Sequence, residues 1–186
     1  MNKHLKPVFK ILLPELEKVG IDYWVFGGVS IASYAQRFIR RNKDVDVFVR
    51  YTDFDRVKSV LEMSCHHNQF HLKYFPPKNS NSKPKIDVMI NGDEIMSVIP
   101  VYQKNNVIEF KYPKGNEKYS VQILEKVRRK ISDYECFTPP DEFIKEIFIN
   151  HMKARPDKKK RKNFQIDAKE ILNQDELTML SWRLTI

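Results

Sequence analysis

The first twenty residues carry apolar side chains at helical spacing. Because residues three and four apart share one face of a helix, this pattern predicts a helix over residues 3–19. The apolar positions are Leu5, Val8, Phe9, Leu12, Leu13, Leu16 and Val19. Gly20 follows at a position where helices commonly end. DYWVFGG then predicts a short buried strand over residues 23–26, which ends at two glycines.

Helical and strand patterns alternate over the next hundred residues. VSIASYAQRF predicts a second helix, and DVDVFV alternates charged and apolar residues as a half-buried strand does. TDFDRVKSVLEM predicts a third helix, because Thr52 is a favourable N-cap and acidic residues follow it. QFHLKYF and KIDVMI predict strands on either side of the polar turn PPKNSNSKP, and residues 95–124 predict short strands and turns.

The end of the chain predicts helices. TPPDEFIKEIFINHMKA begins with a threonine cap, prolines and acidic residues, which favour a helix start. PDKKKRKNFQIDAKEILNQ is a basic run that passes into an amphipathic helix. The whole pattern predicts an α/β (α+β) fold, with a small mixed twisted sheet flanked by helices. We expect this core over residues 1–125 and a C-terminal helical segment, packed on the core, over residues 126–186.

Composition adds a charge preference to this picture. The chain has 186 residues, of which 41% are hydrophobic and 31% charged, which is ordinary for a globular protein with one core. The formal net charge of +9 suits anionic partners such as nucleotides or nucleic acids, and equally suits a solvated lysine-rich surface. No apolar run approaches the ~20 residues of a spanning helix, and the first residues lack the features of a signal peptide. We expect a soluble cytoplasmic protein without a membrane partner.

The two cysteines predict reduced thiols and no disulfide framework. Cys65 lies in CHHNQFH beside three histidines, a group that would suit zinc. No second pair of ligands at zinc spacing follows, so we do not expect a zinc site.

Two aspartates one residue apart are the strongest chemical signal. A strand aims the side chains of Asp44 and Asp46 at one face, about 7 Å apart at their roots, while Val45 and Val47 take the buried face. Two dry carboxylates repel each other unless a cation lies between them, and Mg²⁺ characteristically takes one or two carboxylates plus substrate phosphates. If the strand of Asp87 lies beside the first, three acids converge. Two would hold metal, and the third could also accept a proton from an attacking hydroxyl.

A glycine pair precedes these acids. Gly27 and Gly28 lie where the first strand turns into the second helix, and the backbone N–H groups of a helix start form an anion site. Ser30, in the first helical turn, could donate to a phosphate. Alone, the pair also suits a tight turn, and the two aspartates also suit a solvated edge strand. The signal for such a site is more specific when the glycine pair, the helix, the Asp-x-Asp pair and a later lone aspartate occur together.

This order of motifs resembles the nucleotidyltransferase superfamily that includes DNA polymerase beta. The family pattern is hydrophobic-Gly-Gly/Ser, a helix, Asp-x-Asp and a lone Asp on a neighbouring strand, as in VFGGVSIASYAQ, RNKDVDVFV and KIDVMI. The closer likeness is to its minimal branch of lincosamide and aminoglycoside nucleotidyltransferases and AbiEii-type toxin transferases. Arg37, Arg40, Arg41 and Asp44 roughly follow the Arg-x-x-Arg-x-x-x-Asp-x-Asp run of the antibiotic enzymes.

The C-terminal segment resembles the toxin branch in particular. There, an S/T-P-E helix start leads to a Lys, then to Arg-x-Lys-Asp and a final helix with Asp-Leu. The matching positions here are Lys153, Arg155, Lys162 and Asp167. Asn163 departs from the family, which commonly has Asp after the second Lys.

The resemblance implies transfer of an NMP from an NTP to an acceptor, with Mg²⁺ or Mn²⁺ as cofactor and pyrophosphate as the leaving group. Such a reaction needs charge neutralisation and positioning more than covalent chemistry from the protein. The implied catalytic and metal-binding residues are Asp44, Asp46 and Asp87. The implied nucleotide-binding residues are Gly27, Gly28, Ser30, Lys153 and Lys162.

The sequence does not decide which molecule accepts the NMP. The basic run KARPDKKKRK suits an RNA backbone, the NTP phosphates or a solvated loop. The likeness to toxins allows RNA or protein acceptors and an antitoxin partner, whereas the likeness to resistance enzymes allows an aminoglycoside or a lincosamide. A hypothesis of another class is a catalytically silent module on the same fold, which binds nucleic acid or a protein partner.

Overall fold

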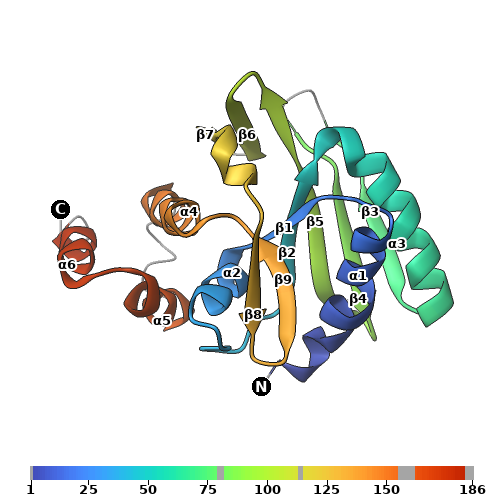
Figure 1. The fold of residues 1–186 in the computed structure, drawn as a ribbon, viewed down its shortest axis with the longest axis horizontal. Coiled ribbons are helices and arrows are strands. Elements are labelled where there is room, and N and C mark those ends of the chain that lie inside the picture. Colours follow the sequence, from blue (N-terminus) through green and yellow to red (C-terminus); the bar gives the residue numbers. More distant parts are fainter. Residues whose placement is uncertain (1, 79–81, 113–114, 155–161, 183–186) are drawn as a thin grey trace.

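The centre of the molecule is a seven-stranded mixed sheet with helices on both faces (Figure 1). The computed structural model describes residues 2–78, 82–112, 115–154 and 162–182. The main path of the sheet runs through β1 (Tyr23–Phe26), β2 (Val45–Arg50), β5 (Asp93–Lys104), β4 (Lys85–Ile90) and β3 (His71–Phe75). β2 and β5 are parallel, and the other neighbours on this path are antiparallel. The far end of β5 pairs with β6 (Val107–Tyr112), which pairs with β7 (Gly115–Ser120).

The helices form two layers around this sheet. One side carries α1 (Leu13–Lys18) and α3 (Phe54–Asn68), and the other carries α2 (Gly27–Tyr34) and α4 (Asp141–Ala154) (Figure 1). α5 (Lys162–Ile171) packs on α2, and α6 (Gln174–Trp182) follows it. The predicted α/β (α+β) architecture, a mixed sheet flanked by helices, is confirmed. Within the described part of the chain, no helix has the length and apolar character needed to cross a membrane.

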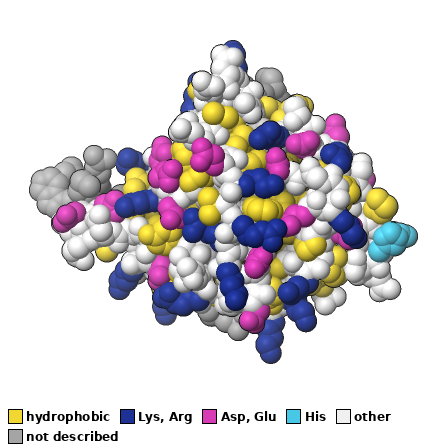
Figure 2. Space-filling view, viewed as in Figure 1, with side chains coloured by type: hydrophobic (Ala, Val, Ile, Leu, Met, Phe, Trp, Pro, Cys, Tyr) yellow, Lys and Arg dark blue, Asp and Glu magenta, His cyan; other side chains and the backbone are white. Residues whose placement is uncertain are grey.

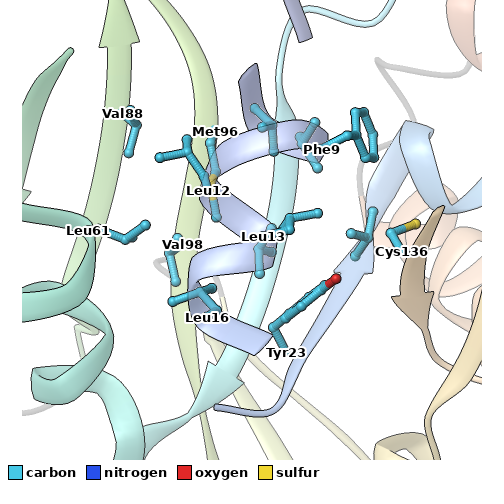
Figure 3. Packing of buried hydrophobic residues seen from close by; sticks show 14 of the residues in the cluster. Phe9, Leu12, Leu13, Leu16, Tyr23, Leu61, Val88, Met96, Val98 and Cys136 are labelled. Carbon is cyan, nitrogen blue, oxygen red and sulfur yellow. The ribbon is translucent and has the colours of Figure 1, made fainter. Parts of the chain in front are cut away.

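Alternation along the strands decides which side chains reach each face of the sheet. Figure 3 shows the core on the side of α1 and α3, where Leu12, Leu13, Leu16 and Leu61 meet Val88, Met96 and Val98. β2 contributes Val45, Val47 and Val49 to this core, all fully buried. Because strand side chains alternate, Asp46 and Phe48 face the other side. The sheet therefore presents its acidic residues on the face opposite α1 and α3.

Both predicted helices at the N-terminal end differ in detail from the structure. The segment over residues 3–19 is helical, but it begins with a 3₁₀ turn (Lys3–Leu5) and a π-helical turn (Val8–Leu12) before α1. α2 begins at the glycine pair itself and ends at Tyr34, earlier than predicted. A left-handed residue follows, Gln36 with φ 56°, and this conformation cannot continue a right-handed helix.

A β-hairpin lies inside the segment that the pattern predicted as helical. It consists of β8 (Val127–Ile131) and β9 (Tyr134–Thr138). Phe137 of the hairpin packs on Tyr23 of β1, with ring centroids 5.7 Å apart. The hairpin thus adds to the strand layer beside β1, and the division of the chain at residue 125 stays a prediction.

Candidate active site

Strand register brings polar residues from three neighbouring strands side by side. Asp46 of β2 is opposite Ser97 of β5, and Ser97 is in turn opposite Asp87 of β4. Phe26, the last residue of β1, is opposite Asp46, and Asp44 directly precedes β2. The aspartate pair therefore lies at the edge of the sheet where β1 ends and α2 begins.

A pocket of about 620 Å³ opens over this edge. Its volume is in the range of small-molecule binding sites. Its charged and polar lining consists of Ser30, Arg40, Asp44, Asp46, Lys83, Lys85, Glu94, Ser97, His151 and Asp167. Its apolar lining consists of Phe26, Ile31, Ile99, Ile144, Ile147, Phe148 and Phe164. Gly27 and Gly28 also line it. The predicted residues Gly27, Gly28, Ser30, Asp44 and Asp46 therefore all lie in the wall of one cavity.

The glycine pair leaves room for two charged side chains. Gly27 has φ +68°, and a Cβ at this position would lie 2.7 Å from Oδ2 of Asp46. A Cβ at Gly28 would collide with the guanidinium of Arg40 and would lie 2.7 Å from Oδ1 of Asn42. The sequence predicted that these glycines make room for phosphates. The structure shows that they first let Asp46 and Arg40 approach the start of α2.

Alanine at Gly27 should therefore do more than strain the backbone. Gly20 provides a matched control, because its φ is +69° and nothing lies within 4 Å of a Cβ there. We expect Gly20→Ala and Gly27→Ala to lose about 1–2 kcal/mol of stability each from the left-handed conformation. Only Gly27→Ala should also weaken Mn²⁺ binding, by about tenfold, because Asp46 must move. Urea unfolding and Mn²⁺ titration of both variants check this, and equal Mn²⁺ affinities would contradict it.

The two acids at the pocket repel each other. Burial and the charge of Asp44 raise the pKa of Asp46 to about 7. Burial, together with the charge and hydrogen bond of Glu94, raises the pKa of Asp44 above its usual range. A divalent cation would relieve this repulsion, and a pair of carboxylates beside an anion site is the donor set that Mg²⁺ takes together with phosphates. Asp44 and Asp46 therefore fit the cofactor that the resemblance implies.

Asp87 does not join this pair directly. The sequence analysis expected the three acids to converge if the strand of Asp87 lay beside that of Asp46, but β5 lies between the two strands. Asp87 is 7% exposed, accepts a hydrogen bond from Ser97 (3.0 Å) and forms an ion pair with Lys85 (2.8 Å). Among the described residues, no three His, Cys, Asp or Glu side chains are grouped as metal ligands would be. The convergence of all three aspartates is thus incomplete in this structure.

Two lysines in the pocket escaped the sequence analysis. Lys83 and Lys85 line the cavity just before and at the start of β4. Burial lowers the pKa of Lys83 to about 8, and the charge of Asp46 partly offsets this effect. Lys85 is two residues before Asp87, so the alternation that placed Asp87 also places Lys85 on the same face. That spacing in KPKID was the signal that was overlooked.

The arginine-rich loop after α2 is tied to α5. Arg40 donates two hydrogen bonds of 2.7 Å, from Nε and Nη2, to the two carboxylate oxygens of Asp167. The two side chains are only 14% and 3% exposed. Arg37 makes a second, more exposed pair with Glu170 at 3.2 Å. Asp167, matched to the toxin branch by sequence, thus lies in the pocket wall as the partner of Arg40.

The remaining predicted nucleotide-binding residues are placed differently. The hydroxyl of Ser30, which is 3% exposed, donates to the carbonyl oxygen of Gly27 at 2.8 Å. Lys153 and Lys162 are exposed on α4 and α5 and are not among the residues that line the pocket. Arg155 and the rest of the basic run over residues 155–161 lie outside the described residues. Phosphate contacts by Ser30, Lys153 and Lys162 stay predictions.

Aromatic rings from α4 and α5 form part of the pocket wall. Phe164 of α5 stacks on His151 of α4, with ring centroids 5.8 Å apart and planes at 12°, and lies 6.0 Å from the ring of Phe148. The cavity lining therefore combines charged residues, among them the strand lysines and the Arg40–Asp167 pair, with aromatic side chains of α4 and α5. On the molecular face shown in Figure 2, basic and acidic side chains are interleaved, so this face presents no continuous basic surface.

The whole chain was compared with known proteins. No family model and no curated protein sequence matches it. The solved structure of ANT(2")-Ia in complex with adenylyl-2"-tobramycin matches with a TM-score of 0.60 and 11% identity, over 98% of this chain and 97% of that one. The lincosamide antibiotic adenylyltransferase LnuA, lincomycin-bound, matches with a TM-score of 0.59 and 11% identity, over 86% and 91%. The Megavirus polyadenylate synthase matches with 0.51 and 12% identity, over 97% of this chain and 34% of that one.

The chain has the nucleotidyltransferase fold. This confirms the fold expected from the resemblance of VFGGVSIASYAQ, RNKDVDVFV and KIDVMI. At 11–12% identity the likeness concerns the fold alone, and the three proteins differ in what their names say they act on. Within this nucleotidyltransferase fold, the chemistry available to the chain is that of its own pocket: a carboxylate pair, a helix start, two lysines and an aromatic wall.

Proposed function

We propose that this chain is a metal-dependent nucleotidyltransferase, which moves an NMP from an NTP to a hydroxyl or phosphate of an acceptor and releases pyrophosphate. One observation carries the proposal. Asp46 lies against Gly27 at the start of α2, inside a pocket that Asp44 also lines, on the nucleotidyltransferase fold. Carboxylates and a helix N-terminus side by side suit a cation and an anion bound together, as in a metal–triphosphate complex.

Different residues of the pocket would have different roles in this reaction. Asp44 and Asp46 would hold Mg²⁺ or Mn²⁺, which when bound neutralises phosphate oxygens. The N–H groups at Gly27 and Gly28 would orient the phosphates, because a helix start attracts anions. Lys83, which lines the pocket, is better placed to contact them than the exposed Lys153 or Lys162.

The aromatic lining suits the nucleobase of the NTP. Phe148, His151 and Phe164 line the cavity from α4 and α5, whereas the lysines come from the segment at the start of β4. Base stacking on aromatic rings contributes roughly 1–3 kcal/mol per base in nucleic-acid complexes. A pocket that combines charged and aromatic lining therefore suits both the phosphates and the base of a nucleotide.

A transfer assay tests the proposed function. The protein is incubated with the four NTPs labelled at the α-phosphate, with Mg²⁺ or Mn²⁺, and with separate pools of RNA, proteins, aminoglycosides and lincosamides. We expect metal-dependent label on a member of one pool, and loss of at least about 10³-fold of it in Asp46→Ala, because the metal ligand is gone. Salt-sensitive RNA binding that Asp44→Asn leaves unchanged, without transfer to any pool, would instead support a silent binding module.

The same variants address the toxin hypothesis. The C-terminal motif match motivates it, and RNA or protein would be the acceptor. Expression of a toxin should stop growth, Asp46→Ala should restore it, and a co-expressed antitoxin should do the same. Growth that continues, together with resistance to an aminoglycoside or a lincosamide, would assign the chain to antibiotic modification.

A further inference from the structure

The ammonium of Lys85 lies between the carboxylates of Asp87 and Glu94. Its Nζ lies 2.8 Å from Oδ1 and 3.1 Å from Oδ2 of Asp87, and 3.3 Å from Oε1 of Glu94. Although burial lowers the pKa of Lys85, Asp87 and Glu94 raise it overall, so the ammonium is charged. Both oxygens of the Asp87 carboxylate are thereby engaged by one side chain.

The influence of this ammonium extends to the aspartate pair. The charge of Lys85 acts on both Asp44 and Asp46, and Asp44 also feels the charge of Glu94. Lys85 is thus a shared positive neighbour of four carboxylates. Lys43 also contacts Glu94, at 2.8 Å, but its side chain is 71% exposed, against 36% for Lys85. An exposed charge is screened by solvent much more strongly than a partly buried one.

We propose that Lys85 is the internal counter-cation of the acidic site, and that a divalent ion displaces it from Asp87 when the ion binds. The proposal rests on the metal-dependent function proposed above. An ammonium and a metal ion compete for the negative charge of the same carboxylate, and the ammonium also repels the incoming cation. Lys85 positions Asp87 and is not itself a metal ligand.

Mn²⁺ titration of lysine variants, without nucleotide, tests the displacement. Lys85→Met removes the competing charge, and we expect it to bind Mn²⁺ about tenfold more tightly than the wild type, because a unit charge a few ångströms away is lost. Lys43→Met, the comparison variant, removes a more exposed lysine that pairs with Glu94 and also acts on Asp44, so it should tighten Mn²⁺ binding less than Lys85→Met does. Lys85→Arg, which keeps the charge, should bind Mn²⁺ like the wild type. Without metal, Lys85→Met should unfold at a lower urea concentration than Lys43→Met, because it leaves the buried Asp87 carboxylate without its ion pair and with the hydrogen bond of Ser97 only.

Each outcome bears on a different part of the account. Equal Mn²⁺ affinities in the wild type and Lys85→Met would overturn the inference about Lys85 but not the proposed metal site. The same conclusion would follow if Lys43→Met tightened Mn²⁺ binding as much as Lys85→Met. Absence of Mn²⁺ binding from the wild type and all variants would overturn the inference together with the proposed function. If Lys85→Met does not fold, Lys85→Gln takes its place, because an amide can still donate to Asp87 without a charge. It too must bind Mn²⁺ more tightly than the wild type.

Discussion

Asp46→Asn should make the metal-free protein more stable at pH 8 while abolishing its response to Mg²⁺. Burial and the neighbouring charge of Asp44 raise the pKa of Asp46 to about 7, from an ordinary value near 4. An acid with a raised folded-state pKa contributes stability that is fully present below its unfolded pKa and is lost as the pH rises through the folded value. The unfolding free energy of the wild type should therefore fall between about pH 4 and 7, by roughly 2–4 kcal/mol.

Urea unfolding in EDTA at pH 4 and pH 8 measures this effect. The asparagine variant should gain roughly 2–4 kcal/mol over the wild type at pH 8 and little at pH 4, where Asp46 is protonated. Asp93→Asn, at an exposed position that begins β5, is the control and should stay within about 0.5 kcal/mol at both pH values. If Asp46→Asn is instead less stable than the wild type at pH 8, the carboxylate serves the fold and the site is structural.

Breaking the Arg40–Asp167 pair should cause the largest loss of stability in the chain's charged network. Arg40→Ala leaves a carboxylate that is 3% exposed without its two hydrogen bonds, and removing one partner of such a buried pair costs about 3–5 kcal/mol. The neighbouring Arg37→Ala breaks a more exposed pair between the same loop and α5, so it should cost only about 0–1 kcal/mol. Urea unfolding at pH 7 compares the two variants.

A double variant separates two effects of breaking this pair: the carboxylate left buried without a partner, and the lost contact between the loop and α5. In Arg40→Met with Asp167→Leu, no charge is left unpaired, so most of the stability should return. Binding of a metal–nucleotide complex should not return with it, because the guanidinium that lies against Gly28 at the start of α2 is gone. Equal stability losses in Arg40→Ala and Arg37→Ala would contradict the view that burial makes the first pair important.

Local patterns predicted the parts of this molecule that depend on neighbouring residues. The period of two in DVDVFV placed Asp46 on the face away from the core, and Asp87 was placed in the same way. The glycine pair predicted a strand-to-helix turn, and α2 begins there. Alternation is a property of any strand, so these inferences needed no knowledge of the partners of each strand.

The features that local patterns did not predict depend on contacts between residues far apart in the sequence. The insertion of β5 between β2 and β4 separates Asp46 from Asp87, and strand order is a tertiary property that no local spacing contains. The contact between Arg40 and Asp167 joins residues 127 positions apart. The hairpin of β8 and β9 was not predicted because its strands are short, with charged residues between the apolar ones, and it gains its place by packing on β1. The ion pair of Lys85 with Glu94 joins β4 to β5 and depends on how these strands pair, which the local pattern does not contain.

The central claim is that Asp44 and Asp46, at the start of α2, bind a metal–nucleotide complex. The most direct measurement is a calorimetric titration of the wild type and Asp46→Asn with the four α,β-methylene NTPs, with and without Mg²⁺. The account predicts that the wild type binds at least one of them only when Mg²⁺ is present, and that Asp46→Asn binds none. Binding to both proteins alike, or binding that does not depend on Mg²⁺, would contradict it.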